Sequence, residues 1–207
     1  TAHEVRDFAL RCIHADEELF RIYCYHCLPY AERETHPFTR AVIDFSATPK
    51  FTAMSRFTRD LAVLDNIAFR SGQLSFDGWL IKRTSAQSII RTGRALTGND
   101  FEPDLKQKHV DMKIGLDVAW LSSKGIVERI ILVTADSDFV PAMKFARHEG
   151  VQVVLLRHAM APGATDPANF DLSKCSTQRN LSERGRQQAA GSKQILVRTD
   201  RGDVRAP

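Results

Sequence analysis

Two aspartates stand directly after an apolar run that reads as a buried strand. The stretch from Ile130 reads IILVTADSDFV, in which Asp136 and Asp138 lie one residue apart. Two carboxylates this close repel each other unless they share a proton or a cation, and hard divalent ions prefer oxygen ligands. The pattern therefore indicates a metal site, although Asp138 alone is also a good N-cap for a following helix.

A third carboxylate, Asp111, interrupts the apolar series KHVDMKIGLDV on a predicted helix. That helix precedes the strand and runs antiparallel to it, so its N-terminal end is expected at the sheet edge where the strand ends. Asp111 can then reach Asp136 and Asp138. Asp117 follows about 240° farther around the helix and is expected to face elsewhere. The alternative for Asp111 is a solvated first-turn acid that the helix dipole favours.

The two aspartates are positioned by a strand, a helix and a second strand. Residues 129–134 and 151–156 are near-continuous apolar runs, which is typical of strands in a parallel sheet with both faces covered. Between them, Asp138 as N-cap, Pro141 in the first turn and Gly150 at the end delimit a helix. This βαβ unit places the aspartates at the carboxyl ends of the strands, where open parallel sheets bind ligands.

The other elements follow from the spacing of apolar residues. Apolar residues at helical intervals predict helices, and short runs of β-branched and aromatic residues predict strands. The sequence predicts helices over residues 3–15, 51–64 and 106–122, and strands over residues 20–25, 67–69 and 79–81. A polar loop with Pro37 and Pro49 follows the first strand.

The composition fits a soluble globular chain. It has 207 residues, 43% of them hydrophobic, which suits one domain with a tail. No apolar run approaches the roughly 20 residues of a membrane-spanning helix, and the N-terminus has no secretory pattern. We therefore expect a cytoplasmic protein with no membrane partner. The chain begins at Thr1 within what reads as a helix, so we also expect a segment upstream.

The four cysteines have no disulfide-scaffold spacing, which suits a reducing compartment. Cys24 and Cys27 form a C-x-x-C pair, which occurs in redox motifs and zinc sites. No second Cys/His pair with ligand spacing follows, however, and residues three apart on a strand point to opposite faces. We therefore expect two half-buried strand cysteines here.

The excess positive charge lies at the C-terminal end. Residues 1–156 contain 20 basic and 20 acidic residues, whereas residues 157–207 contain 9 basic and 5 acidic ones. The segment LSERGRQQAAGSKQ is typical either of a nucleic-acid-binding arm or of a solvated tail, and its composition favours neither.

Two long stretches resemble one known family. QKHVDMKIGLDVAWL and IILVTADSDFVPAMKFARHEGVQVVLL together resemble the NYN domain, in particular its LabA-like branch within the PIN-like nuclease superfamily. RIYCYHCLPY resembles the branch's Arg-Ile-aromatic-Tyr segment before a proline, and FRSGQLSFDGW resembles its Gly-x-Leu…Gly-Trp segment. The resemblance spans residues 3–172.

The resemblance implies an α/β fold, a PIN-like three-layer α/β/α sandwich with a mainly parallel central sheet. It implies an NYN domain over residues 1–172, with the first strand missing upstream, and leaves residues 173–207 as a basic C-terminal tail. It also implies that Asp111, Asp136 and Asp138 bind Mg²⁺ or Mn²⁺ for RNA cleavage.

The sequence departs from the family pattern in two places. The family's first strand, which carries an Asp followed by a Gly- and Asn-containing turn, is not in the sequence, and His109 stands where the branch commonly has glycine. Asp44 in AVIDF is a candidate substitute for the missing acid, in a region that the resemblance makes a loop.

We expect a metal-dependent endoribonuclease whose partner is RNA, single-stranded RNA included. Lys108 is a candidate phosphate contact, and Tyr25 and His26, at the end of a neighbouring strand, are candidates for stacking on a base or hydrogen bonding to it. The alternatives are a solubilising lysine and packing at the edge of the sheet.

Two other functions stay open. One is a non-catalytic RNA-binding or regulatory module that retains the fold. The other is a haloacid dehalogenase-like phosphatase, because DSDFV fits the D-x-D-x-[TV] pattern. A homodimer also stays open.

Overall fold

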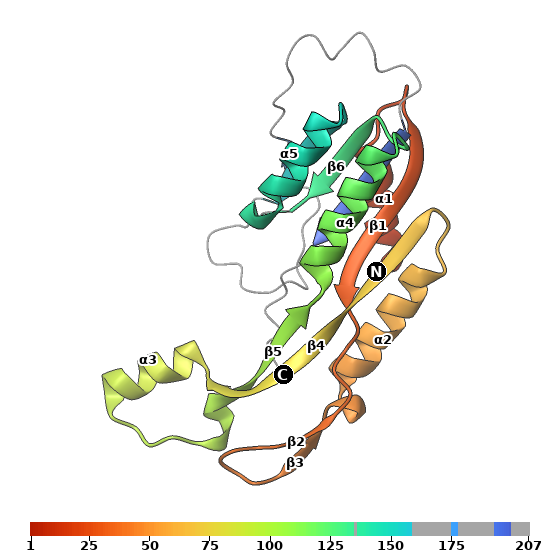
Figure 1. Cartoon of the computed structure of the whole chain (residues 1–207). Coiled ribbons are helices and arrows are strands. Elements are labelled where there is room, and N and C mark those ends of the chain that lie inside the picture. The colour runs from red at the N-terminus through yellow and green to blue at the C-terminus, as the bar shows by residue number, and fades with distance from the viewer. Residues whose placement is uncertain (135, 159–174, 178–192, 200–207) are drawn as a thin grey trace.

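The computed structural model describes residues 1–134, 136–158, 175–177 and 193–199 (Figure 1). The described residues form a seven-stranded sheet in the order β5, β4, β1, β9, β6, β7, β8. The strands are β1 (Glu18–Cys27), β4 (Ile67–Ile81), β5 (Phe101–Lys108), β6 (Arg129–Val133), β7 (Gln152–His158), β8 (Cys175–Thr177) and β9 (Lys193–Thr199).

The sheet is parallel in its centre and antiparallel at both edges. Neighbouring strands from β4 across to β7 run parallel. The edge strands β5 and β8 run antiparallel to their neighbours. The sheet is therefore mixed, and the predicted parallel arrangement holds for its central strands.

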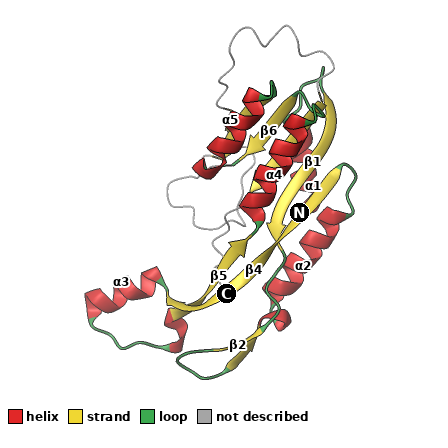
Figure 2. Ribbon diagram, in the orientation of Figure 1, coloured by secondary structure: helices red, strands yellow, loops and turns green. Residues whose placement is uncertain are grey.

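Helices cover both faces of the sheet (Figure 2). The helices α1 (Ala2–Arg11) and α2 (Pro49–Ala62) pack on one face, and α4 (Val110–Ser123) and α5 (Val140–His148) pack on the other. The predicted three-layer α/β/α architecture is confirmed. A further helix, α3 (Arg83–Thr92), lies at the far end of the β4–β5 ribbon, away from these layers (Figure 1).

Each face of the sheet has its own hydrophobic core, because successive strand residues point to opposite faces. On β1, Ile22 and Cys24 face α1 and α2, whereas Tyr23, Tyr25 and Cys27 face α4 and α5. The buried strand β6 alternates in the same way. Its near-continuous apolar sequence follows from this burial on both faces, as predicted.

The N-termini of α1 and α2 are fixed by threonine caps. Thr1 forms a capping box with Glu4, and the Thr48 hydroxyl accepts a hydrogen bond from the Phe51 N–H. Pro49 occupies the first turn of α2, where its missing N–H leaves no helical hydrogen bond unmade. The first and last residues of both helices lie within a few positions of the predicted bounds.

Three parts of the prediction around β4 need correction. The two short predicted strands at 67–69 and 79–81 are one strand, β4, with a register shift between Phe76 and Trp79 beside Gly78. Residues 106–108 belong to β5, so α4 begins later than predicted. The strand β5 was missed because it is polar and lies at an edge.

The loop between β1 and α2 contains a small second sheet. It is formed by β2 (Arg33–Thr35) and β3 (Val42–Asp44), which pair antiparallel and lead into a short 3₁₀ helix, η1 (Phe45–Ala47). The prediction of a plain loop in this region was therefore wrong.

The predicted tail over residues 173–207 contributes two strands to the main sheet. The strand β8 pairs with β7, and β9 lies between β1 and β6, parallel to both. These two strands were not predicted, because the short apolar run QILV stands among basic and polar residues and was counted with them as part of the tail. The boundary predicted at residue 172 lies outside the described residues.

Candidate functional site

Asp136 and Asp138 lie in a tight turn at the carboxyl end of β6. The buried Thr134 continues the strand, since its N–H donates to the Leu156 carbonyl at 3.1 Å. Its hydroxyl accepts a hydrogen bond from the Asp136 N–H at 3.0 Å, and Asp136 Oδ1 accepts one from the Asp138 N–H at 2.9 Å. The turn therefore holds the Asp136 carboxylate in a defined orientation.

Asp138 does not cap the following helix, which corrects the prediction. Asp136 instead caps a short 3₁₀ helix, η3 (Ser137–Phe139), and α5 begins after it without a side-chain cap. The expected placement of Pro141 in the first turn of α5 is confirmed. The 3₁₀ turn shifts the capping role by two residues and leaves the Asp138 side chain exposed.

Asp111 lies in the first turn of α4 and is exposed. Burial raises the pKa of the neighbouring Cys27 thiol, and the negative charge of Asp111 raises it further. A hydrogen bond with the Lys108 backbone and the positive charge of Lys113 lower it. The preceding residue, Val110, packs beside Gly72 and Cys27, so the first turn of α4 lies near the carboxyl end of β1. The Lys113 side chain does not extend freely into solvent there, because its Nζ donates to the Ser71 carbonyl at 2.5 Å.

Gly72 allows the start of α4 to pack tightly against the sheet. A Cβ at this position would lie 2.5 Å from Val110 Cγ2, 2.8 Å from Cys27 Sγ and 2.9 Å from the Lys108 carbonyl oxygen. No larger residue fits without moving backbone. The packing role of Gly72 was not predicted from the sequence, although the Gly-x-Leu segment that begins at Gly72 could have indicated it.

His109 connects β5 to α4 in a left-handed backbone conformation, with φ of 70°. Glycine adopts this conformation at little cost, whereas a side chain makes it unfavourable. The geometry explains why glycine suits this position, and it makes His109 a strained exception immediately before the turn that carries Asp111.

The three predicted acids share one edge of the sheet but do not form one cluster. Among the described residues, no group of three or more His, Cys, Asp and Glu side chains is arranged to hold a metal ion. β9 separates β1 from β6, but α4, which carries Asp111, contacts both β1 and η3. A joint role of Asp111 with the Asp136–Asp138 pair stays a prediction.

Tyr25 is a core residue, 3% exposed, rather than a surface for a base. Its hydroxyl donates to Asp117 Oδ2 at 2.7 Å, and Arg70 binds both oxygens of the same carboxylate at 3.1 and 3.0 Å. Burial raises the pKa of the Tyr25 hydroxyl. The packing interpretation of Tyr25 is therefore favoured over base stacking. Asp117 therefore faces the strands β1 and β4, which carry Tyr25 and Arg70.

His26 and Lys108 lie on different sides of this edge. The His26 ring contacts Met54 Sδ at 3.2 Å and meets the edge of the Phe57 ring, so it packs against α2 on the face opposite Asp111. Lys108 is exposed at the end of β5, just before His109. Of the three predicted substrate contacts, Lys108 alone is exposed beside an acid of the site.

Cys24 and Cys27 belong to opposite core layers, as expected for residues three apart on a strand, but both are buried and not half-buried as predicted. A shared ion or a disulfide between them does not fit this arrangement. Asp44 is also accounted for structurally, because it pairs with Arg33 at 2.8 Å and its Oδ1 accepts a hydrogen bond from the Ser46 N–H. Its proposed role as a substitute acid has no support in this geometry.

A strand that ends in a two-aspartate turn, with a helix bringing a further acid to the same edge, is the arrangement expected from the sequence resemblance. A comparison with protein-family models finds a similar family for part of the chain. Residues 71–169 match the NYN domain. This segment is therefore similar to the NYN domain of the PIN-like superfamily, and the α/β/α layers with their mixed sheet are consistent with that fold.

The NYN match contains Asp111, Asp136, Asp138 and Lys108. Tyr25 and His26, on β1, lie outside it. Assignment to the LabA-like branch stays a prediction, as do the roles of the individual residues.

One curated relative is an uncharacterized protein of Methanocaldococcus jannaschii, 24% identical over 100 residues. The alignment covers 48% of this chain and 40% of the archaeal protein, so the chain spans less than half of that relative. No solved structure gives a significant match. In the part of the chain that the structure describes, no helix is both long and apolar enough to span a bilayer.

Proposed function

We propose that this chain is a metal-dependent ribonuclease that hydrolyses RNA phosphodiester bonds at the carboxyl edge of its sheet. The observation that carries the proposal is the Asp136–Asp138 turn, directly after the buried strand β6 and inside the segment that matches the NYN domain. Asp111 supports it, because α4 brings this acid to the same edge of the sheet.

The donor set is chemically suited to Mg²⁺ or Mn²⁺. Carboxylate oxygens are the ligands these ions prefer, and the turn after β6 carries two aspartates one residue apart. Asp136 and Asp138 would hold the ion, with Asp111 as the third acid. A bound divalent ion would lower the pKa of a water molecule and stabilise charge on the phosphate.

The protein side chains would contribute position and charge. The turn fixes Asp136 through its Oδ1, so this carboxylate is oriented before substrate binds, which reduces the cost of organising the site. The exposed Asp138 and Lys108 would meet the substrate, with Lys108 contacting phosphate. Neither Tyr25 nor His26 belongs to this set.

A non-catalytic RNA-binding module is the second candidate. The observation in its favour is that the described residues do not assemble three metal-ligating side chains. A further aspartate, Asp200, comes directly after β9 in the sequence, but it lies outside the described residues and is not part of this comparison. The phosphatase alternative is not proposed, because the D-x-D-x-V pattern lies within the NYN match.

The test is metal-dependent cleavage of RNA by the purified chain. Labelled single-stranded RNA should be cut in Mg²⁺ or Mn²⁺, remain intact in EDTA, and be cut again when Mn²⁺ is restored in excess. Cleavage that persists in EDTA would contradict the metal-dependent mechanism. RNA that binds but stays intact under all conditions would favour the non-catalytic module.

A further inference from the structure

The ribbon formed by β4 and β5 leaves the body of the molecule at the acidic edge. The last residue pair between β1 and β4 joins Cys27 and Gly72, and beyond it β4 pairs with β5 alone. The strand β5 then returns to Lys108, two residues before α4 begins. The ribbon is therefore rooted beside Asp111 and projects outward from there (Figure 1).

Residues 78–99 at the end of this ribbon, which include α3, form a segment that we call the basic arm. The arm contains Lys82, Arg83, Arg91 and Arg94 and no aspartate or glutamate. Arg94 is neutralised by the buried Asp100, whose carboxylate it binds through two hydrogen bonds at 2.6 and 2.8 Å. Among the described acids, none forms an ion pair with the other three cations.

The Arg94–Asp100 pair holds the arm in a fixed shape. The Thr97 N–H and hydroxyl also donate to Asp100, at 2.8 and 3.0 Å, and the Lys82 N–H donates to the Asp100 carbonyl at 2.8 Å. Asp100 thus joins the loop after α3 to the root of the helix, through its carboxylate on one side and its backbone carbonyl on the other. The three remaining cations are presented by an ordered element, which lowers the entropic cost of binding a ligand.

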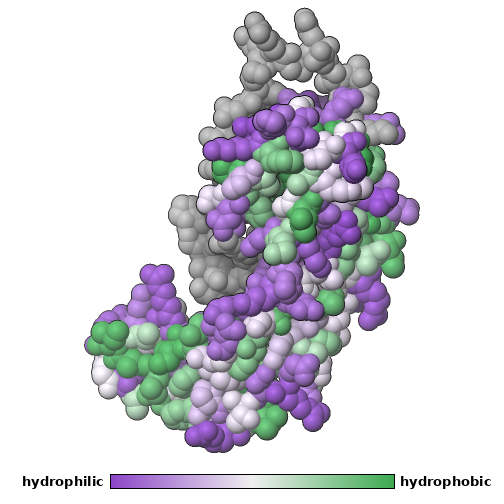
Figure 3. Space-filling model, in the orientation of Figure 1, coloured by the Kyte–Doolittle hydropathy of each residue, from purple (hydrophilic) through white to green (hydrophobic). Residues whose placement is uncertain are grey.

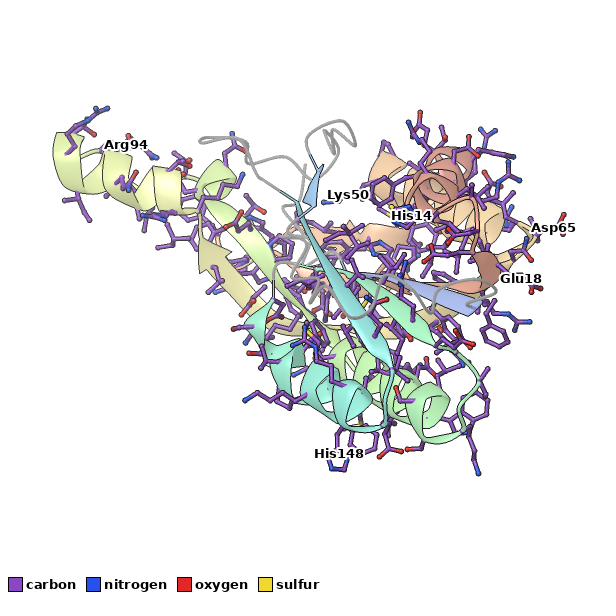
Figure 4. All side chains as sticks on the ribbon, turned by 90° about the horizontal axis from the view of Figure 1, so that it is seen from above. His14, Glu18, Lys50, Asp65, Arg94 and His148 are labelled. Atoms are coloured by element: carbon purple, nitrogen blue, oxygen red, sulfur yellow. The ribbon has the colours of Figure 1, made fainter. Side chains whose placement is uncertain are left out.

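The arm lies on the side of the molecule away from the amino ends of the parallel strands β1 and β4. Figure 4 shows Arg94 at one extreme and Asp65 and Glu18, at the starts of β4 and β1, at the other. The free part of β4, residues 73–81, spans about 30 Å at ~3.3 Å per residue. A ligand that occupied both the acidic edge and α3 would therefore be an extended polymer.

We propose that the basic arm binds the phosphate backbone of the RNA strand whose scissile bond lies at the acidic edge. This inference rests on the proposed ribonuclease function. RNA suits both features, since it is an extended polyanion, and lysine and arginine contacts to phosphate position nucleic acids without reading their sequence. Exposed Thr84 and Gln87 on α3 add hydrogen-bond donors on the same element.

The competing partner is another protein, for which the arm offers exposed apolar residues. Ile90 is 85% exposed, and Leu80 and Leu96 are also exposed. Figure 3 shows hydrophilic and hydrophobic areas next to each other over the arm. The lack of any acid over the whole arm favours RNA, because an interface between protein chains has no need to exclude acidic residues.

The test compares two triple variants of equal charge change. The arm variant is Lys82→Gln, Arg83→Gln and Arg91→Gln. The control is Arg59→Gln, Lys124→Gln and Arg147→Gln, three exposed cations near the C-terminal ends of α2, α4 and α5, toward the opposite edge of the sheet. Binding to a labelled single-stranded RNA that is long enough to reach α3 is measured in EDTA at several salt concentrations.

The arm variant should bind at least about tenfold more weakly, with a salt slope shallower by about 2, at ~0.7 per lost phosphate contact. The control variant should keep the unaltered slope, and both variants should keep the unaltered melting temperature. An arm variant whose slope equals that of the control overturns the proposal. So does a dimer in solution that Ile90→Glu dissociates while RNA binding stays unchanged, because the arm is then a protein interface.

A trinucleotide substrate, too short to reach α3, separates this proposal from the ribonuclease function. The arm variant should cleave it at the unaltered rate and lose activity on long RNA through a higher KM. If the unaltered chain cleaves neither substrate but the arm variant still flattens the salt slope, the ribonuclease function fails and the arm stands. If cleavage occurs and the slope does not change, the arm proposal fails alone.

Discussion

Gly72 and Val110 are in such close contact that a Cβ on Gly72 would lie 2.5 Å from Val110 Cγ2. The contact joins β4 to the first residue of α4, one position before Asp111. Because the Lys108 carbonyl oxygen and Cys27 Sγ crowd the same space, the helix cannot move aside without disturbing two strands. The position of Asp111 therefore depends on a glycine 39 residues earlier in the chain.

Gly72→Ala should lower the free energy of unfolding by about 1–3 kcal/mol, as overpacking in a core does. The measurement is chemical denaturation of the variant beside Gly115→Ala, whose Cβ would meet no neighbouring atom within 4 Å. Because Gly115 lies within α4, alanine there should stabilise the chain slightly. Equal stability of the two variants would mean that α4 packs less closely than the structure shows.

His109→Gly should raise the free energy of unfolding by about 0.5–1 kcal/mol. The left-handed conformation costs a side-chain-bearing residue more than it costs glycine, and the gain is reduced by the greater freedom of glycine in the unfolded chain. Thermal melting of His109→Gly and His109→Ala gives the comparison. An alanine variant as stable as the glycine variant would show that residue 109 does not adopt this conformation in solution.

The stability of the arm should depend on pH through Asp100. Asp100 accepts hydrogen bonds from Arg94 and Thr97, and these hold its pKa well below the usual value of 3.8. The bonds from Arg94 have the larger effect. A lowered folded-state pKa means that the contribution of Asp100 to stability is complete above the unfolded-state pKa and is lost as pH falls below it.

Asp100→Asn should therefore melt at a lower temperature than the unaltered chain near pH 6, and the gap should narrow below about pH 4. Melting curves over this range are the measurement, with Asp65→Asn as an exposed-acid control. A gap that stays constant down to pH 3 would show that Asp100 is not ionised in the folded state or is not paired.

Removal of β9 should destabilise the whole sheet. A chain that ends at Ser192 leaves β1 and β6 with unpaired edges in the middle of the sheet, and buried backbone groups without partners are costly. We expect a loss of several kcal/mol in unfolding free energy, at about 1 kcal/mol per lost hydrogen bond. A chain that ends at Thr199 keeps β9 and should melt like the full chain.

Equal melting of all three chains would mean that β9 does not occupy this position in solution. The result also governs any test of the C-terminal residues in RNA binding. A truncation after Asp171 would remove β8 and β9 together with the basic residues around them, so it would change the fold and the charge at once.

Local pattern was sufficient for the elements whose residues face a core. The helices α1 and α2 were predicted from apolar residues at helical intervals, the strands β6 and β7 from near-continuous apolar runs, and α5 from the residues that delimit it. The Asp136–Asp138 pair was found for the same reason, since two acids directly after a fully apolar strand stand out in the sequence.

The other features depend on contacts between distant residues. Tyr25 bonds to Asp117, 92 positions away, so nothing near Tyr25 in the sequence indicates that its hydroxyl is already occupied. The place of β9 beside β6 joins residues more than 60 positions apart.

The measurement that tests the central claim most directly is RNA cleavage by Asp136→Asn. Asparagine keeps an oxygen that can accept the Asp138 N–H, so the turn and the melting temperature should persist while one negative charge is removed. We predict that cleavage of single-stranded RNA in Mn²⁺ falls by at least about a hundredfold, the scale of losing one group that stabilises the transition state. Asp65→Asn, at the opposite edge of the sheet, should cleave at the unaltered rate. Full activity in a correctly folded Asp136→Asn chain would contradict the assignment of the catalytic site to this edge.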